Sequence, residues 1–262
     1  VSTRPVEKRV IDTVKWVTDN YDIDPNRVYL SGNSMGGSGA LGIGLRHGDI
    51  FAAIKANVPA GIEHADQRMS FSDFKKSENL NLPDPPITLN YSGQNDGWSF
   101  GHDRFVKAMN ERKYPLYFYW GAFGHANNHA RILKVNDLIN SFDWINVRKN
   151  QAYPVFTNAS CNSKLPWPDN LKDKNSGQLN AFFRWRSISD TEKDFKISLF
   201  MISSDQLKTE FRIPEKATVD VSLRRLQRMK FNEGDSVKWS FGKVNGETII
   251  GSVPSYLSRS LR

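Results

Sequence analysis

The first 150 residues alternate between segments with helical spacing and short apolar segments. In residues 5–20 four valines recur at helical spacing with charged residues between them, which predicts an amphipathic helix. Further helices are predicted over residues 34–46, 102–112 and 130–147, and strands over residues 27–30, 51–58, 86–91 and 115–120. Helices that alternate with apolar strands in this way predict an α/β fold with a mainly parallel sheet.

The pattern changes after residue 152. Residues 157–177 are rich in Asn, Ser, Pro and Lys, which is typical of a linker or a long loop. Asn245-Gly246 is a strong hairpin signal. Strand-like segments are residues 179–188, 195–201, 217–223, 226–231, 236–241 and 247–253. We therefore predict two domains, an α/β region over residues 1–152 and a small antiparallel, β-sandwich-like domain over residues 153–262.

Composition and charge exclude several classes of protein. Apolar residues make up 39% of the chain, enough for a sizeable core, and no apolar run approaches the roughly 18 residues of a membrane-spanning helix. The single cysteine, Cys161, excludes an intramolecular disulfide, and the sequence has no Cys/His zinc pattern. The net charge is +8, and residues 151–262, with 18 basic and 12 acidic residues, contribute +6 of it.

The densest basic run lies in this second region. Arg224, Arg225, Arg228 and Lys230 are interleaved with apolar residues, and no nucleic-acid-binding motif surrounds them. We interpret the run as the outer face of a strand pair, with a surface for an anionic partner as the alternative.

Candidate chemistry is concentrated at Ser34, in the segment Gly32-Asn33-Ser34-Met35-Gly36-Gly37. This Gly-x-Ser-x-Gly pattern follows a predicted strand and precedes a predicted helix rich in Gly and Ala, the context of a nucleophile elbow. Glycines are expected there because a serine on a sharp, strained turn leaves no room for neighbouring Cβ atoms. The helix N-terminus favours negative charge, so the backbone N–H of Met35 is a candidate oxyanion donor. A solvated serine in a glycine-rich turn is the alternative.

A serine nucleophile needs a base, and the base needs a carboxylate to orient it. The candidate acid is Asp96, which follows the predicted strand over residues 86–91. The carboxyl end of that strand should bring Asp96 to the same edge of the sheet as Ser34. The alternatives are Asp103, seven residues later, and a purely turn-forming role for the sequence Asn-Asp-Gly.

The candidate base is His125, which lies in a glycine-containing loop after the predicted strand over residues 115–120. His125 and His129 have the spacing of a two-histidine metal site, but no Glu lies between them, so we expect no metal site. His102 and His129 are expected to have surface or structural roles, and His47 and His64, which precede the candidate acid, are expected to lie in loops.

The segment from Asp24 to Gly37 resembles the elbow of α/β-hydrolase serine esterases. It is most similar to the branch that joins prolyl-oligopeptidase-like hydrolases with polyhydroxybutyrate-depolymerase-like and feruloyl or acetyl-xylan esterases, and the likeness covers roughly residues 5–150. The resemblance implies an α/β-hydrolase fold and cleavage of a carboxylic ester through an acyl-serine intermediate, without a metal or organic cofactor. A prolyl-oligopeptidase-like peptidase and a non-catalytic carbohydrate-binding or scaffold protein are the alternatives.

Trp98 and Trp120, beside the acid and base loops, are candidates for lining an acyl or sugar pocket, with core packing as the alternative. The family has several strands before the elbow and a loop that supplies a second oxyanion N–H, whereas 33 residues precede Ser34 here. We therefore expect a preceding part of the same protein, or another chain, to complete the sheet. The expected substrate is a small-molecule or polysaccharide ester, and neither nucleic acid nor a membrane is expected as a partner.

Overall fold

The computed structural model of the protein describes residues 3–70, 82–125, 137–168, 176–207, 209–232, 234–242 and 248–254. Its helices are α1 (Pro5–Asn20), α2 (Met35–Gly44), α3 (Ile62–Met69) and α5 (His102–Glu111), with the short 3₁₀ helices η1 (Gly97–Ser99) and η3 (Trp144–Asn146). Its strands are β1 (Tyr29–Asn33), β2 (Ala53–Asn57), β3 (Ile87–Gly93), β4 (Leu116–Gly121), β5 (Tyr153–Thr157), β6 (Gly177–Leu179), β7 (Phe183–Asp190), β8 (Phe195–Met201), β9 (Asp220–Arg224), β10 (Ser236–Gly242) and β11 (Thr248–Pro254).

The central sheet has five described strands in the order β1-β2-β3-β4-β6. Strands β1 to β4 pair in parallel, and β6 pairs antiparallel with β4 at the edge of the sheet. The predicted α/β fold with a mainly parallel sheet is therefore confirmed. The four strands predicted before residue 122 begin and end within three residues of the observed ones, and α1 has the predicted bounds.

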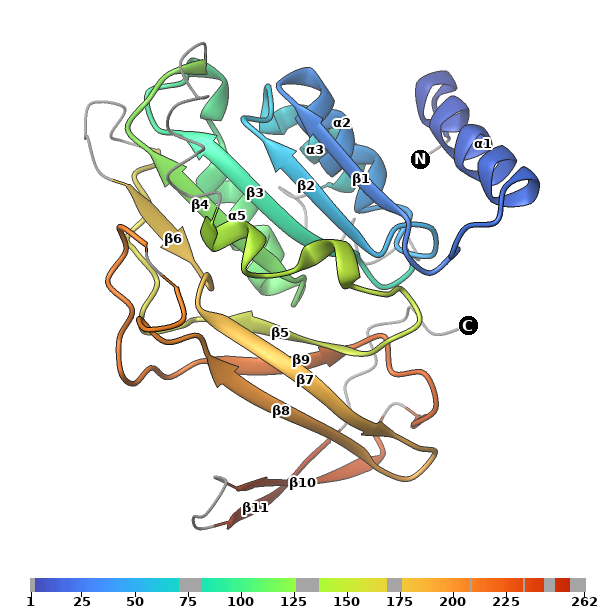
Figure 1. The fold of residues 1–262 in the computed structure, drawn as a ribbon, viewed down its shortest axis with the longest axis vertical. Coiled ribbons are helices and arrows are strands. Elements are labelled where there is room, and N and C mark those ends of the chain that lie inside the picture. Colours follow the sequence, from blue (N-terminus) through green and yellow to red (C-terminus); the bar gives the residue numbers. More distant parts are fainter. Residues whose placement is uncertain are drawn as a thin grey trace.

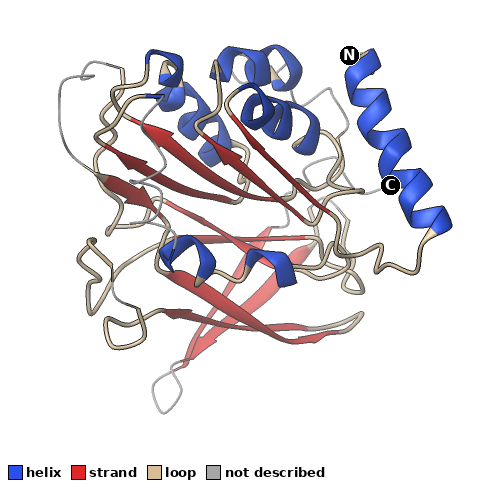
Figure 2. Ribbon diagram, turned by 45° about the horizontal axis from the view of Figure 1, so that its top comes forward, coloured by secondary structure: helices blue, strands red, loops and turns tan. Residues whose placement is uncertain are grey.

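Both faces of this sheet are covered, and β4 shows how. Leu116, Phe118 and Trp120 point into a core shared with α2, α3 and α5, whereas Tyr117 and Tyr119 point into a second core on the opposite face. This alternation follows from the two-residue period of a strand. Figure 2 shows α2, α3 and α5 above the sheet, and the short helical segments around residues 137–146 and the strands of the C-terminal region below it.

The described strands after residue 152 pair antiparallel, and they are divided among several sheets. Within the described residues, β6 joins the central sheet, and the others form the two-stranded sheets β5–β9, β7–β8 and β10–β11 (Figure 1). The fold is thus a mainly parallel sheet with separate antiparallel sheets, and a small β-sandwich is not confirmed. A domain boundary at residue 152 stays a prediction. Residues 153–156 and 181–183 do share a core with β3 and β4.

The interpretation of the basic run as an outer strand face is wrong. Strand β9 ends at Arg224, and residues 226–231 form no strand. Arg225 is 6% exposed, and its guanidinium donates to the carbonyl oxygens of Gly48, at 2.7 Å, and Phe51, at 2.9 Å. A guanidinium has five donors and needs acceptors when it is buried, and these carbonyl groups supply them. Arg225 thus ties the C-terminal region to the segment before β2.

Two predictions fall partly outside the described residues. The helix predicted over residues 130–147 is seen in part, because residues 137–140 are helical and η3 follows, while residues 126–136 are not described. The Asn245-Gly246 turn is not described either, but the flanking strands β10 and β11 pair antiparallel. In the part of the chain that the structure describes, no helix has the length and apolar character to cross a membrane.

Candidate active site

Ser34 lies at the sharp turn between β1 and α2. Its backbone has φ 55° and ψ −121°, a conformation that L-residues rarely adopt. Two backbone hydrogen bonds fix the turn: the Ser34 N–H donates to the Asn57 carbonyl at 3.0 Å, and the Ala60 N–H donates to the Ser34 carbonyl at 2.9 Å. Backbone strain of this kind persists only where surrounding contacts hold it, and it is frequent at functional sites.

The glycines around Ser34 differ in how strictly the fold requires them. A Cβ on Gly32 would lie 2.1 Å from the Gly36 carbonyl oxygen, and one on Gly37 would lie 2.8 Å from the Asn57 carbonyl oxygen. A Cβ on Gly36 would meet no heavy atom within 4 Å. The predicted steric reason for the glycines therefore holds at Gly32 and Gly37, and space alone does not require Gly36.

Asp96 follows β3, and its carboxylate is almost fully buried. One carboxylate oxygen, Oδ1, accepts the backbone N–H of Trp98 at 2.9 Å. The other, Oδ2, lies 2.6 Å from Nδ1 of His125. Both oxygens of this buried group are therefore hydrogen-bonded, and the carboxylate has a fixed orientation toward the histidine.

His125 lies after β4 and connects the other two residues. Its Nε2 is 2.7 Å from the Ser34 hydroxyl oxygen, and its Nδ1 faces Asp96. Because a carboxylate only accepts, the partners assign the proton to Nδ1 and leave Nε2 to accept the serine hydroxyl. The structure thus brings the predicted acid and base together with Ser34 at the carboxyl ends of β1, β3 and β4.

The loops that carry Asp96 and His125 are joined to each other. The Gln94 N–H donates to the Gly121 carbonyl at 2.8 Å, and the Asn95 N–H donates to the Phe123 carbonyl at 3.1 Å. A Cβ on Gly93 would lie 2.5 Å from that Phe123 carbonyl oxygen, so the close approach requires glycine. Sequence reasoning missed Phe123, although glycines at the ends of both neighbouring strands were a visible signal.

The remaining predicted site residues lie in different surroundings. Trp98 is 52% exposed, and its ring centroid is 6.2 Å from that of His125, so it lies beside the imidazole. Trp120 is 1% exposed and packs against Phe118 and Trp167 in the core. The predicted pocket role of Trp120 is therefore wrong, because its alternating position on β4 points it under the helices. Met35 is the first residue of α2 and is largely exposed.

The alternative acid and bases lie outside this arrangement. Asp103 is in the first turn of α5. His102 is fully buried between Phe118 and Trp167, and burial lowers its pKa to about 4. His47 contacts Glu7 at 2.9 Å, and burial lowers its pKa as well. His64 is exposed and lies in α3, so the expectation of a loop is wrong there, and His129 lies outside the described residues.

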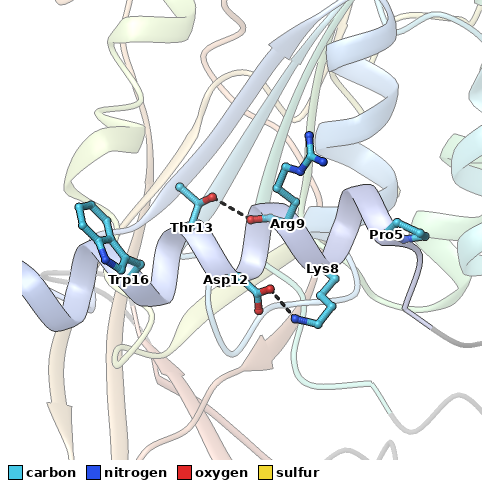
Figure 3. Close-up of a pocket in the computed structure, with 6 residues that line it drawn as sticks. All are labelled: Pro5, Lys8, Arg9, Asp12, Thr13 and Trp16. Atoms are coloured by element: carbon cyan, nitrogen blue, oxygen red, sulfur yellow. Dashed lines mark hydrogen bonds and ion pairs between the residues drawn. The ribbon is translucent and has the colours of Figure 1, made fainter.

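A hollow on the surface lies away from the site, and the described residues form no metal-binding group. A surface hollow on α1, shown in Figure 3, contains none of the three site residues and is lined by Pro5, Lys8, Arg9, Asp12, Thr13 and Trp16. Across the described ranges, no group of three or more His, Cys, Asp or Glu side chains is placed to hold a metal ion.

Comparison with known proteins gives one family match. Residues 12–79, which include Ser34, match the model of a family described as "Putative esterase". The resemblance to serine esterases noted from the Ser34 segment is confirmed over these residues. No curated protein matches the chain.

The fold is similar to parts of several solved structures. The S-formylglutathione hydrolase of Staphylococcus aureus is 16% identical, with a TM-score of 0.42 over 53% of this chain and 60% of that one. Esterase B of Lactobacillus rhamnosis is 16% identical, with a TM-score of 0.40 over 55% of this chain and 62% of that one. A ferulic acid esterase is 20% identical, with a TM-score of 0.36 over 44% and 51%. The chain thus spans about 60% of the length of the first of these proteins. Similarity of this degree gives no information about the activity of the present chain.

Proposed function

We propose that the protein is a serine hydrolase that cleaves a carboxylic ester through an acyl-serine intermediate. The observation that carries the proposal is the chain of two hydrogen bonds from Ser34 to His125, at 2.7 Å, and from His125 to Asp96, at 2.6 Å. The strained backbone of Ser34 at a helix N-terminus and the esterase family match over residues 12–79 add support.

In the proposed mechanism His125 acts first as a base and then as an acid. Its Nε2 takes the proton of the Ser34 hydroxyl as the oxygen attacks the ester carbonyl, and it then gives that proton to the departing alcohol. Asp96 holds the imidazole in the required tautomer and stabilises its protonated form. In the second half of the reaction Nε2 of His125 takes a proton from water as the water oxygen attacks the acyl carbon, and it then returns that proton to the Ser34 oxygen as the bond to the acyl group breaks and the carboxylic acid leaves.

Two further residues complete the proposed site. The first N–H groups of a helix have no acceptor within the helix, so we propose that the Met35 N–H donates to the oxyanion. The half-exposed indole of Trp98, beside His125, is proposed to line the substrate pocket. The substrate is proposed to be a small-molecule or polysaccharide ester, and the reaction needs no metal or organic cofactor.

Replacement of Ser34 tests the proposal. Ser34→Ala should reduce hydrolysis of p-nitrophenyl acetate to background, because loss of a serine nucleophile typically costs about 10⁶ in kcat. The variant should also fail to react with a fluorophosphonate probe. Ser31→Ala, at an exposed position on β1 three residues earlier, is the matched control and should keep wild-type turnover and labelling.

The outcomes separate the three candidate functions. Wild-type turnover in Ser34→Ala would overturn the assignment of the nucleophile. Labelling of Ser34 combined with cleavage of proline-containing peptides, rather than esters, would favour a peptidase. A folded wild-type protein that neither reacts with the probe nor hydrolyses esters would favour a non-catalytic binding protein. A panel of acetyl, feruloyl and hydroxybutyryl esters would identify the acyl group.

We also propose a partner strand for the central sheet and a role for the C-terminal region. Strand β1 lies at an edge of the described sheet and is partly exposed, so we propose that another strand, from the same protein or another chain, pairs with it. For residues 153–262 we propose an accessory region, and their organisation as a small β-sandwich domain is part of that proposal. Native mass spectrometry of the protein as purified from its source tests for a second chain.

A further inference from the structure

The turn that carries Asp96 is held by Ser99. Both the backbone N–H and the hydroxyl of Ser99 donate to the Asp96 carbonyl oxygen, at 2.9 Å and 2.7 Å. The Ser99 carbonyl in turn accepts Nδ1–H of His102 at 2.5 Å. Ser99 is fully buried, so each of these bonds forms away from solvent.

The Ser99 hydroxyl has a second partner, Trp167. The indole N–H of Trp167 donates to the Ser99 hydroxyl oxygen at 2.9 Å. An indole nitrogen only donates, and a hydroxyl has a single hydrogen. The bond from Trp167 therefore leaves the Ser99 hydrogen to point at the Asp96 carbonyl, and the direction of the chain Trp167–Ser99–Asp96 is fixed.

Aromatic packing fixes Trp167 itself. Its side chain is 5% exposed and stacks on His102, with ring centroids 5.0 Å apart, and on Phe118, with centroids 5.7 Å apart. Trp167 lies in the segment between β5 and β6, far in sequence from the acid loop. A buried indole whose N–H is bonded to one acceptor fills space in the core and also fixes the orientation of that acceptor.

From this geometry we propose that Trp167 is a positioning residue for Asp96, acting through the Ser99 hydroxyl. The inference rests on the proposed function, in which Asp96 orients His125. Without the indole N–H, the Ser99 hydroxyl is free to rotate away from the Asp96 carbonyl, and the turn that aims the Asp96 carboxylate at His125 loosens. The C-terminal region thereby contributes to the reaction without touching the substrate.

The test removes the indole N–H and keeps an aromatic ring at this position. Trp167→Phe should lower kcat for p-nitrophenyl acetate about tenfold, the scale of one neutral hydrogen bond, with KM unchanged. Ser99→Ala, which deletes a single oxygen atom, should lower kcat at least as much. The double variant should match Ser99→Ala, because both changes break the same chain. Trp185→Phe is the matched control, since Trp185 packs against Phe142 in the other core and should keep the wild-type kcat.

A spectroscopic readout separates positioning from a general loss of stability. The low-field proton resonance of the His125 Nδ1–H, bonded to Asp96, should broaden or shift in Trp167→Phe and Ser99→Ala and stay unchanged in Trp185→Phe. Should Trp167→Phe fail to fold, Ser99→Ala alone decides. An unchanged resonance and kcat in Ser99→Ala, or additive effects in the double variant, would overturn the proposal. If the wild-type protein hydrolyses no ester, the proposed function fails, and the resonance still decides whether Trp167 and Ser99 position Asp96.

Discussion

The turn at Ser34 and the pair formed by Asp96 and His125 reach the same edge of the sheet by different routes. Ser34 takes its conformation from a contiguous segment, in which Gly32 lets the chain pass the carbonyl of Gly36 and α2 begins at the next residue. Asp96 and His125 are 29 residues apart in sequence and are aligned by bonds between their two loops and by Ser99. The first half of the site is therefore a local motif, and the second is a product of tertiary structure.

This difference has a consequence for how each half fails. A local turn depends on backbone sterics, so a single added Cβ changes it directly. A carboxylate held by a network depends on several hydrogen bonds, so its geometry degrades in steps as they are removed.

After removal of the nucleophile itself, the largest expected effect is on the Asp96–His125 pair. Asp96→Asn should lower kcat by about 10⁴, because an amide at this position favours the wrong tautomer of the histidine and does not stabilise its charged form. Steady-state hydrolysis of p-nitrophenyl acetate measures it. The matched control is Asp103→Asn at a partly buried position in the first turn of α5, which should keep turnover within about twofold, since Asp103 lies outside the hydrogen-bonded group of Ser34, His125 and Asp96. A larger loss in Asp103→Asn than in Asp96→Asn would transfer the acid role to Asp103.

The sequence predicts Ser34, Asp96 and His125, but it does not predict the residues that hold Asp96 in place. The Ser34 elbow can be predicted because its strand, glycines and helix are adjacent in the sequence. Asp96 and His125 can be predicted because they follow Ser34 in the chain order acid, then base, each after a predicted strand. The bond from Trp167 to Ser99 could not be predicted, because the two residues are 68 positions apart and Trp167 lies in a segment whose Asn, Ser, Pro and Lys content is typical of a linker. Trp120 was misassigned because its place beside a loop hid its position on β4, where alternate residues face opposite cores.

The same limit explains the C-terminal region. Its strands were predicted from two-residue alternation, which gives the existence of a strand but not its partner. β6 pairs with β4 of the central sheet, and Arg225 binds carbonyls that precede it by more than 170 residues. Partners at such separations are set by packing of the whole chain, and no local pattern records them.

A second prediction tests the local half. Gly32→Ala should lower the free energy of unfolding by about 4 kcal/mol, because its Cβ would collide with the backbone oxygen of Gly36 and force the turn to move. Gly36→Ala is the matched control. Its Cβ meets open space, and alanine in a helix is expected to raise the free energy of unfolding by about 0.5–1 kcal/mol. Urea denaturation of both variants measures the difference. Equal effects of the two substitutions would show that local sterics do not shape the turn.

The third and smallest effect is the pH dependence of the free energy of unfolding. It should come from His102, which lies on the Asp96 side of the site, because the glycines and backbone amides of the Ser34 turn do not titrate. Burial between Phe118 and Trp167 lowers the pKa of His102 from 6.5 to about 4, although Asp96 and Asp103 nearby favour its charged form. Between these two values the unfolded chain binds a proton that the folded chain does not. The free energy of unfolding should therefore fall by about 3 kcal/mol as the pH drops from above 6.5 to about 4, at 1.36 kcal/mol per pKa unit.

His102→Phe isolates this contribution from those of the other titratable groups. Phenylalanine keeps the ring packing and cannot bind a proton, so the difference between wild type and variant should carry the His102 part of the pH dependence. The lost bond to the Ser99 carbonyl should add a cost of about 1–2 kcal/mol that is the same at every pH. Urea denaturation at half-unit steps from pH 4 to 8 measures both. If wild type and variant lose stability in parallel as the pH falls, protonation of His102 is not the cause of the loss.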